Sequence, residues 1–378
     1  MAFEQGPIRP PSEARSLLLR VTRNCPWNRC AFCPVYKGKK FSRRKEEEII
    51  GDIDAVARGL DAAVELSRSM GCGGEVTAPV VQALVQSPGV AEAEAAAGVW
   101  LYHGEGSVFL QDSDALVIPA AAIIRVLRHL RETLPMITRV TCYSRSATLA
   151  KKGAGALKQI REAGLDRVHA GLESGSKNVL ELIQKGATPE THVRAGRAAM
   201  DAGLELSEYV MPGIGGKEFS REHAVESARV ISEISPDFTR LRSLGIRGRT
   251  PIRNMVDKGE IEVLDDDGMV KEIRLLIENL AGARTMLVSD HILNLLGNLE
   301  GRLPGDQAKL LAIIDAYLEL PRKEKDIFRL GRRACVFNST DDLRNPGRRR
   351  IAEGIYEEAQ SSGMTIDEMC REMLSRMI

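Results

Sequence analysis

Short apolar runs alternate with longer amphipathic segments through the first two thirds of this 378-residue chain. Runs such as "SLLLRV" at 16–21 have the length of buried strands, and the segments between them have helical periodicity. Strands that alternate with helices favour parallel βαβ units. The predicted strands span residues 16–21, 107–110, 137–143, 167–172, 204–210 and 238–244. This order fits a partial (β/α)6 barrel, and a doubly wound sheet fits it almost as well.

Two segments interrupt the alternation. Residues 66–106 are longer than a crossover requires and are predicted to be a helical insertion with Gly-rich ends. After residue 254 the predicted strands stop and helical patterns follow, so we expect a barrel domain over 1–254 and a helical region over 255–378. Ser42 and Ser220 are predicted to cap helices. In either architecture the functional side chains should lie at the carboxyl ends of the strands.

The overall charge gives little guidance to partners. The 53 basic and 52 acidic side chains leave a formal charge of +1, so no global field attracts nucleic acid or a membrane. A local basic run at 37–45 leaves open, as possible partners, nucleic acid or a reductase with an acidic surface.

No apolar run reaches about 18 residues, and we see no secretory signal. The seven cysteines are too few and too unevenly spaced for a disulfide framework, which predicts a cytoplasmic protein with reduced thiols and no membrane contact.

Three cysteines stand close together in the stretch "CPWNRCAFCP", at Cys25, Cys30 and Cys33. A structural zinc site or a closed four-cysteine cluster would need its fourth ligand from an unpaired residue far away. Three thiolates on a [4Fe–4S] cluster instead leave one iron open to chelate a small molecule. We therefore favour the iron–sulfur interpretation and keep structural zinc as the alternative.

This cysteine loop and the blocks after it resemble the radical S-adenosylmethionine (SAM) superfamily over roughly residues 15–250. The signature of that family is CxxxCxxC with an aromatic residue before the last cysteine, and this chain has one residue more between Cys25 and Cys30. The stretches "GLESGSKNVL" at 171–180 and "VMPGIGG" at 210–216 resemble the branch that holds the oxygen-independent coproporphyrinogen oxidases and the Elongator catalytic subunit.

The resemblance implies a [4Fe–4S] cluster on the three cysteines and SAM on its open iron. It also implies reductive cleavage of SAM to methionine and a 5′-deoxyadenosyl radical, with the electron from a flavodoxin- or ferredoxin-type donor. The implied SAM contacts are Phe32, Gln111, Asp112, Glu173, Ser174, Arg197, Met211, Pro212 and Gly213. Ser144 and Arg145 end the third predicted strand and are expected to reach SAM or the substrate.

Arginines gather at the end of the sixth predicted strand. Arg240 and Arg242 lie two residues apart, so they share one face, and a planar guanidinium fits a carboxylate or phosphate. Further arginines follow at 247, 249 and 253, and three aspartates stand at 265–267. We expect an anionic substrate held at this strand end. Solvated arginines, or arginines that pair with these aspartates to dock the helical region, are the alternatives.

Asp290 and His291 are two further catalytic candidates, contributed by the helical region. A helix-capping role, with Asn294 one helical turn beyond Asp290, is the favoured alternative. For the whole chain, the leading hypothesis is a radical SAM enzyme. The competing hypothesis is a non-catalytic iron–sulfur or zinc-binding scaffold.

Overall fold

The computed structural model describes residues 3–87, 89–246, 248–280 and 282–376. The chain divides into two compact units. Unit 1 comprises Met1–Asn28, Gly38–Ala170 and Arg194–Leu206, and unit 2 comprises Arg29–Lys37, Gly171–Val193 and Ser207–Ile378. The cysteine loop therefore contributes to both units, with Cys25 in unit 1 and Cys30 and Cys33 in unit 2.

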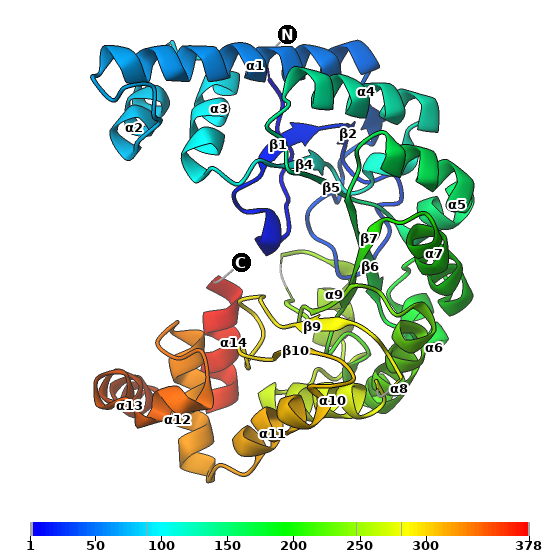
Figure 1. Ribbon diagram of the computed structural model, residues 1–378. Helices are drawn as coiled ribbons and strands as arrows, with labels where there is room; N and C mark the ends of the chain where they lie inside the picture. Colours follow the sequence, from blue (N-terminus) through cyan, green and yellow to red (C-terminus); the bar gives the residue numbers. More distant parts are fainter. Residues whose placement is uncertain (1–2, 88, 247, 281, 377–378) are drawn as a thin grey trace. The chain divides into compact units, whose positions relative to one another are not determined.

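The described residues form a mostly parallel sheet with the strand order β1-β4-β5-β6-β7-β8-β9-β10 (Figure 1). Its strands are β1 (Leu17–Arg20), β4 (Ser107–Gln111), β5 (Arg139–Tyr143), β6 (Arg167–Glu173), β7 (Glu205–Val210), β8 (Phe238–Leu241), β9 (Met286–Val288) and β10 (Glu300–Arg302). A separate ribbon pairs β2 (Thr22–Arg23) with β3 (Ser42–Arg43). Each of the six predicted strands coincides with a strand of the sheet, and the α/β barrel-type fold class is confirmed.

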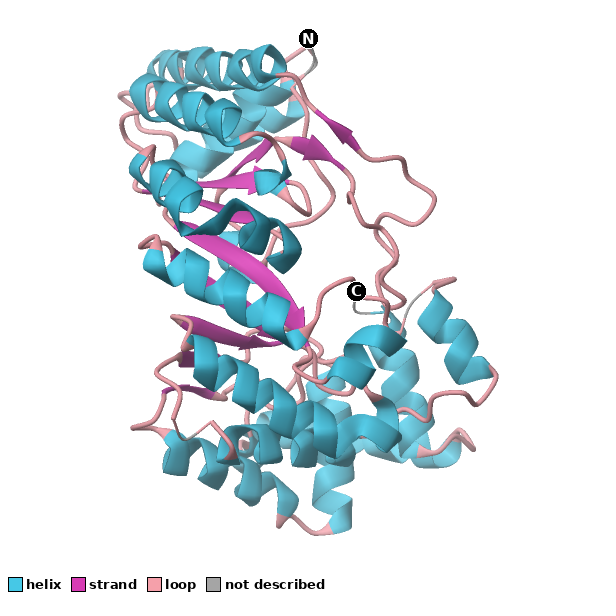
Figure 2. Cartoon of the chain, turned by 90° about the vertical axis from the view of Figure 1, so that its right-hand side faces the viewer, coloured by secondary structure: helices cyan, strands magenta, loops and turns pink. Residues whose placement is uncertain are grey.

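Helices follow the strands along the chain, and loops join the two kinds of element (Figure 2). In unit 1 the long helix α1 (Glu46–Ser69) packs against α3 (Glu92–His103) and α4 (Ala120–Thr133). A side chain at Gly59 would bring its Cβ within 2.8 Å of the Glu94 backbone, so glycine permits this close helix contact. The remaining helices of the first two thirds are α2 (Ala78–Gln86), α5 (Ser146–Glu162), α6 (Lys177–Leu182), α7 (Pro189–Asp201) and α8 (Gly216–Ile234). The segment 66–106 contains the end of α1, all of α2 and all of α3, and its assignment as an insertion stays a prediction.

Both predicted serine caps are wrong. Ser42 lies in β3, and α1 begins four residues later, where the Lys45 amide donates a 2.6 Å hydrogen bond to the Glu48 carboxylate. Ser220 lies inside α8, which begins at Gly216. Gly216 has a φ of 61°, so the preceding loop turns in a conformation that glycine adopts easily and the helix starts earlier than a serine would indicate.

The last third of the chain is mainly helical. Its helices are α9 (Pro251–Asp257), α10 (Asp266–Glu278), α11 (Gln307–Leu318), α12 (Arg322–Arg333), α13 (Pro346–Ser361) and α14 (Ile366–Arg376). A short 3₁₀ turn covers Thr340–Arg344, and two others lie earlier in the chain, at Pro11–Glu13 and Ala115–Val117. The buried Asp266 joins α10 to α12 through ion pairs with Arg329 and Arg333. Strands β9 and β10 extend the sheet in a region where only helices were expected. They were not predicted because a three-residue strand is too short to show a periodic pattern.

Candidate functional site

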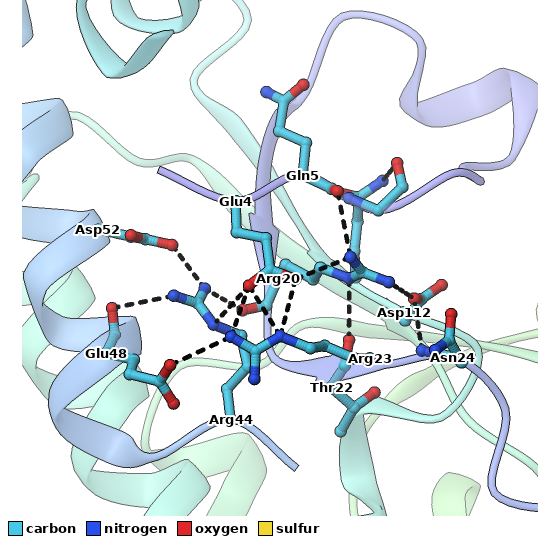
Figure 3. A network of polar contacts seen from close by, with 12 residues as sticks. Glu4, Gln5, Arg20, Thr22, Arg23, Asn24, Arg44, Glu48, Asp52 and Asp112 are labelled. Carbon is cyan, nitrogen blue, oxygen red and sulfur yellow. Dashed lines mark hydrogen bonds and ion pairs between the residues drawn. The ribbon is translucent and has the colours of Figure 1, made fainter. Parts of the chain in front are cut away.

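In unit 1, Asp112 fixes the entry to the cysteine loop (Figure 3). Its fully buried carboxylate accepts hydrogen bonds from Arg20 at 2.8 Å and from the Asn24 amide at 3.0 Å. Asn24 directly precedes Cys25 and has a φ of 68°, a left-handed conformation that asparagine tolerates better than most residues. The segment after β4 therefore sets the direction in which the chain enters the loop.

A cluster of arginines surrounds Glu4 beside this entry (Figure 3). Glu4 accepts hydrogen bonds from Arg20 at 2.8 Å and from Arg23 at 2.9 Å. Burial alone raises the pKa of Glu4, but the hydrogen bonds and charges of the arginines outweigh it and lower the pKa below its usual value. Arg44 of the same cluster donates a buried 2.5 Å hydrogen bond to Asp52 of α1. The N-terminal segment, β1 and α1 are thus tied together beside the loop.

Gln111, the other predicted SAM contact after β4, is also engaged within unit 1. Its side chain accepts a hydrogen bond from the Gly6 amide at 2.7 Å and donates to the Ile8 carbonyl at 2.9 Å. Its exposed fraction is 1%. Gln111 therefore holds the N-terminal segment and Asp112 the entry to the loop, and their direct contact with SAM stays a prediction.

The end of β5 meets the cysteine loop at Trp27. The guanidinium of Arg145 lies 5.0 Å from the centre of the Trp27 ring, within the range of a cation–π interaction. Ser144 beside it donates a 2.9 Å hydrogen bond to Asp114, and Thr148 donates to the same carboxyl at 2.6 Å. Burial raises the pKa of Asp114 despite these donors. Sequence reasoning placed Ser144 and Arg145 at the site but missed Trp27, which lies inside the cysteine motif.

In unit 2, Ala31 anchors the second half of the cysteine loop. Its amide donates to the Ile183 carbonyl after α6 at 2.8 Å, and its carbonyl accepts from the Ile252 amide of α9 at 3.1 Å. Ala31 is 1% exposed and packs in an apolar cluster with residues of the loops after β7 and β8, including Met211 and Leu244. Phe32 packs against the same cluster, so Cys30, Phe32 and Cys33 are carried on a fixed segment.

Glu173, Lys185 and Phe32 come together at the end of β6. Glu173 accepts a 2.8 Å hydrogen bond from Nζ of Lys185, and that atom lies 5.9 Å from the centre of the Phe32 ring. Glu173 has a φ of 62°, a strained conformation of the kind that clusters at functional sites. A Cβ at Gly171 would lie 2.2 Å from Oε1 of Glu173, so glycine leaves room for the ion pair. Sequence reasoning identified Glu173 and Phe32 but missed Lys185.

A second carboxyl, Glu208 of β7, lies close to this group. It is fully buried, and burial raises its pKa to about 8. The charge of Glu173 acts in the same direction, whereas Lys185 and the Leu172 amide partly offset it. Glu208 is therefore a mainly neutral acid at pH 7. Glu208 shares the predicted strand 204–210 with Glu205, and its place among the apolar residues Leu206, Tyr209 and Val210 was a signal that sequence reasoning left unused.

The loops after β6 and β7 are joined through their backbones and through a buried pair of side chains. The Met211 amide donates to the Glu173 carbonyl at 2.9 Å. Oγ of Ser174 lies 2.8 Å from Nδ1 of His223, and the Gly213 amide donates to Glu272 at 2.7 Å. Ser174 and the 211–213 loop, both predicted SAM contacts, thus share one buried support, and neither His223 nor Glu272 was predicted.

Arg240 and Arg242, the predicted substrate arginines, have different environments. Arg240 is buried, donates to Ser207 at 3.2 Å and pairs with Asp290. Arg242 lies beyond the end of β8 and is exposed. The aspartates proposed as their partners are used elsewhere: Asp265 accepts from the Gly268 amide, Asp266 pairs with Arg329 and Arg333, and Asp267 with Lys325. Arg247 lies outside the described residues.

The remaining predicted residues are Asp290, His291 and Arg197, and Asp290 is the partner of Arg240 described above. Residues 289–298 form a loop, so Asp290 and His291 cap no helix there and the favoured alternative is wrong. Nδ1 of His291 accepts from the Leu293 amide at 3.3 Å. Asn294 accepts from the Ser243 amide at 2.9 Å and so fixes the chain after β8. Arg197 is exposed on α7, in the part of that helix that belongs to unit 1.

The donor chemistry of the cysteine loop fits an iron–sulfur cluster. Cys25, Cys30 and Cys33 are partly exposed, and no disulfide involves them. Three thiolates are the soft ligands that such clusters take. Over the residues that the structure describes, no three His, Cys, Asp or Glu side chains are gathered to share one metal ion. Within those same residues no helix has the length and apolar character needed to cross a bilayer.

Comparisons with known proteins identify the family. The sequence profile of the Radical SAM superfamily matches residues 19–228. The tRNA uridine(34) acetyltransferase of Methanocaldococcus jannaschii is 22% identical over 122 residues, which cover 32% of this chain and 23% of that protein.

Similar solved structures include Methanocaldococcus infernus Elp3 (18% identity, TM-score 0.42, 56% of this chain and 53% of that one). They also include coproporphyrinogen III oxidase from Escherichia coli (13% identity, TM-score 0.45, 70% and 52%). The chain thus spans about a quarter of the curated relative and about half of each of these structures. Because the family profile covers more than half of its residues, the chain belongs to the radical SAM superfamily.

Proposed function

We propose that this enzyme holds a [4Fe–4S] cluster on Cys25, Cys30 and Cys33 and binds SAM at the loops after β4, β6 and β7. When bound, the cluster and SAM supply a one-electron cleavage that yields methionine and a 5′-deoxyadenosyl radical able to take a hydrogen atom from the substrate. The electron comes from a flavodoxin- or ferredoxin-type donor. Lys39, Lys40, Arg43 and Lys45 are exposed after the cysteine loop and suit a donor with an acidic surface.

The attachment of Ala31 is the observation that carries this proposal. Two backbone hydrogen bonds and an apolar cluster hold Ala31 against α6, α9 and the loops after β7 and β8. Phe32, which lies between Cys30 and Cys33, packs against the cluster that contains Met211, and its ring centre is 5.9 Å from Nζ of Lys185, the partner of Glu173. Phe32 offers an apolar face for the adenine, and Glu173 offers a carboxylate for the amine or ribose of SAM. Fixed donors of this kind bind at lower entropic cost than mobile ones.

The substrate is proposed to be anionic. Arg240 is committed to Asp290 and Ser207, so it is a poor candidate for the anion. Arg242 lies two residues further on, beyond the end of β8, and is exposed. We assign the anion to Arg242, with Arg249 of the following loop also exposed. The competing function is a non-catalytic scaffold that keeps the cluster but cleaves no SAM.

Product analysis separates the enzyme from the scaffold. Protein reconstituted anaerobically with iron and sulfide is mixed with dithionite and SAM, and 5′-deoxyadenosine is measured by mass spectrometry. The proposal expects 5′-deoxyadenosine from the native protein and none from the variant with Cys25, Cys30 and Cys33 all replaced by Ala. If protein with a fully loaded cluster forms no 5′-deoxyadenosine, whether or not candidate anionic substrates are added, the protein is the non-catalytic scaffold instead.

A further inference from the structure

We propose that His223 and Glu272 are positioning residues, which hold the loops after β6 and β7 in the arrangement that binds SAM. The inference rests on the proposed function, because it assumes that these loops contact SAM. Neither side chain lies on a loop itself. His223 belongs to α8 and Glu272 to α10, so each acts through the loop residue to which it is bonded.

The side chain of Glu272 holds the loop after β7 through a bond to the loop backbone. Oε1 accepts the Gly213 amide at 2.7 Å, and the side chain is 2% exposed. Ser220 of α8 also faces this carboxyl, and among the described residues Oε2 has no hydrogen-bond partner. Gly213 has a φ of 84°, and a Cβ there would lie 3.0 Å from Met269 of α10. The loop is therefore seated closely on α10, and the Glu272 bond fixes the direction of its turn.

His223 holds the loop after β6. Its Nδ1 lies 2.8 Å from Oγ of Ser174, and that oxygen accepts the Ser176 amide at 3.0 Å. The serine hydroxyl proton is then available for Nδ1, which places the imidazole proton on Nε2. Nε2 faces Oε1 of Glu272 at 3.6 Å. One continuous path of polar contacts thus runs from Ser174 through the two helical side chains to Gly213.

The neighbouring contacts restrict the same loop from a second direction. The Gly175 amide donates to Oγ of Ser227 at 2.8 Å, one helical turn after His223. A Cβ at Gly175 would lie 2.2 Å from the Glu226 carbonyl, so the loop lies directly on the α8 backbone. Such a loop has little freedom to shift while His223 and Ser227 keep their bonds.

Burial sets the protonation states of His223 and Glu272. Burial lowers the pKa of His223 to about 4, so the imidazole is neutral near pH 7. Burial raises the pKa of Glu272 to about 7, so this carboxyl is partly ionised at neutral pH. The groups that face Glu272 are the Gly213 amide from the loop and Ser220 and His223 from α8. An ionised Glu272 accepts the Gly213 amide more strongly than a neutral one.

The test compares SAM binding with stability in cluster-loaded protein. Glu272→Leu removes the acceptor for the Gly213 amide, and Glu272→Gln restores an acceptor of the same shape. We expect Glu272→Leu to weaken SAM binding about tenfold in anaerobic calorimetry, as for the loss of one good hydrogen bond, and Glu272→Gln to stay within about twofold. His223→Leu is a second variant with the same expected direction, should Glu272→Leu fail to fold.

Glu13→Leu is the matched control. Glu13 also forms a buried pair with a histidine, at 3.3 Å from Nε2 of His169 in unit 1, but its other partners, Ser16 and Arg139, belong to no predicted SAM loop. It should lower the melting temperature while leaving SAM binding within about twofold. Equal weakening by Glu13→Leu and Glu272→Leu, or native affinity in both Glu272→Leu and His223→Leu, would overturn the inference.

Hydrogen exchange gives a readout that does not need SAM. In Glu272→Leu the amides of 173–176 and 211–216 should exchange at least about tenfold faster than in the native protein, and in Glu13→Leu they should not. Native protein that binds no SAM would defeat the proposed function, and the exchange rates would still decide whether these residues position the loops. Unchanged exchange in Glu272→Leu would show that they do not.

Discussion

Nζ of Lys185 lies 2.8 Å from Oε1 of Glu173, at the point where β6 ends. Both side chains are largely buried, with exposed fractions of 13% and 11%. The lysine therefore neutralises a carboxylate that stands beside Phe32. SAM carries a sulfonium and an ammonium group, so it would compete with Lys185 for this carboxylate. In the proposed site, Lys185 would be the counter-charge of Glu173 until SAM binds.

Replacing Glu173 should therefore affect SAM binding more than folding. For Glu173→Ala we expect SAM to bind roughly 10- to 100-fold more weakly, because a charge-assisted hydrogen bond contributes ~1.5–3 kcal/mol. Glu173→Ala also leaves the largely buried Lys185 without this partner, so the affinity is compared in protein that is shown to stay folded. Calorimetry under anaerobic conditions measures the affinity, with Glu173→Gln as the isosteric control of intermediate effect. Native affinity in Glu173→Ala would remove this residue from the site.

Iron content should depend on the cysteines of the loop alone. Replacing Cys25, Cys30 or Cys33 by Ala should abolish a cluster of about four irons per chain, because each removes one of three thiolate ligands. Cys72 and Cys335 are also at least partly exposed, and their Ala variants are matched controls that should load normally. Iron analysis and electron paramagnetic resonance of the reduced proteins provide the comparison. Stoichiometric zinc without iron uptake would favour the structural-zinc interpretation.

The buried His223–Glu272 pair predicts two opposing pH dependences of stability. The folded-state pKa of Glu272 is raised to about 7, so between pH 4.5 and pH 7 the folded protein keeps a proton that the unfolded chain has lost, and stability falls as pH rises. The pKa of His223 is lowered to about 4, so between pH 4 and pH 6.5 the unfolded chain binds the extra proton, and stability rises with pH. The two effects largely cancel in the native protein.

Separate variants should reveal each effect. Glu272→Gln should become more stable as pH rises from 4 to 6.5, and His223→Gln less stable from 4.5 to 7, each by on the order of 3 kcal/mol. Urea unfolding across this range is the measurement, and the double variant should vary least. Parallel pH profiles for both single variants would contradict the assigned protonation states.

Asp112 should stabilise the loop entry more than a surface ion pair does. Asp112→Ala leaves the Asn24 amide without its acceptor while Arg20 keeps Glu4, and losing a buried hydrogen-bond partner costs about 1–3 kcal/mol. Glu46→Ala breaks an ion pair with the exposed Arg125 and should cost about 0–1 kcal/mol. Denaturant unfolding of both variants decides the comparison. Similar losses would show that the Asp112 bonds are not the ones that fix the loop.

The sequence predicts the elements better than it predicts the buried polar contacts. The strands were found because short stretches rich in apolar residues alternate with helical patterns, and the cysteine loop because three thiols lie within nine residues. His223 and Glu272 each read as an ordinary polar position on an amphipathic helix, and their partners are 49 and 59 residues away. Local pattern gives no information about such pairs. The arginines near residue 240 show the same limit, since the partner of Arg240 comes from the loop after β9.

Arg240 and Arg242 should separate stability from substrate binding. Arg240→Gln breaks bonds to Asp290 and Ser207 and should cost about 1–3 kcal/mol in urea unfolding, whereas the exposed Arg242→Gln should stay within about 0.5 kcal/mol.

If Arg242 binds the anionic substrate, small-molecule extracts retained by an anion exchanger should stimulate 5′-deoxyadenosine formation by the native enzyme. Arg242→Gln should keep the basal cleavage of SAM and lose most of this stimulation, because the variant has no guanidinium to bind the anion with two hydrogen bonds. Stimulation confined to the unretained fraction would show that the substrate is not anionic. Equal stimulation of Arg242→Gln would move the anion site to another residue.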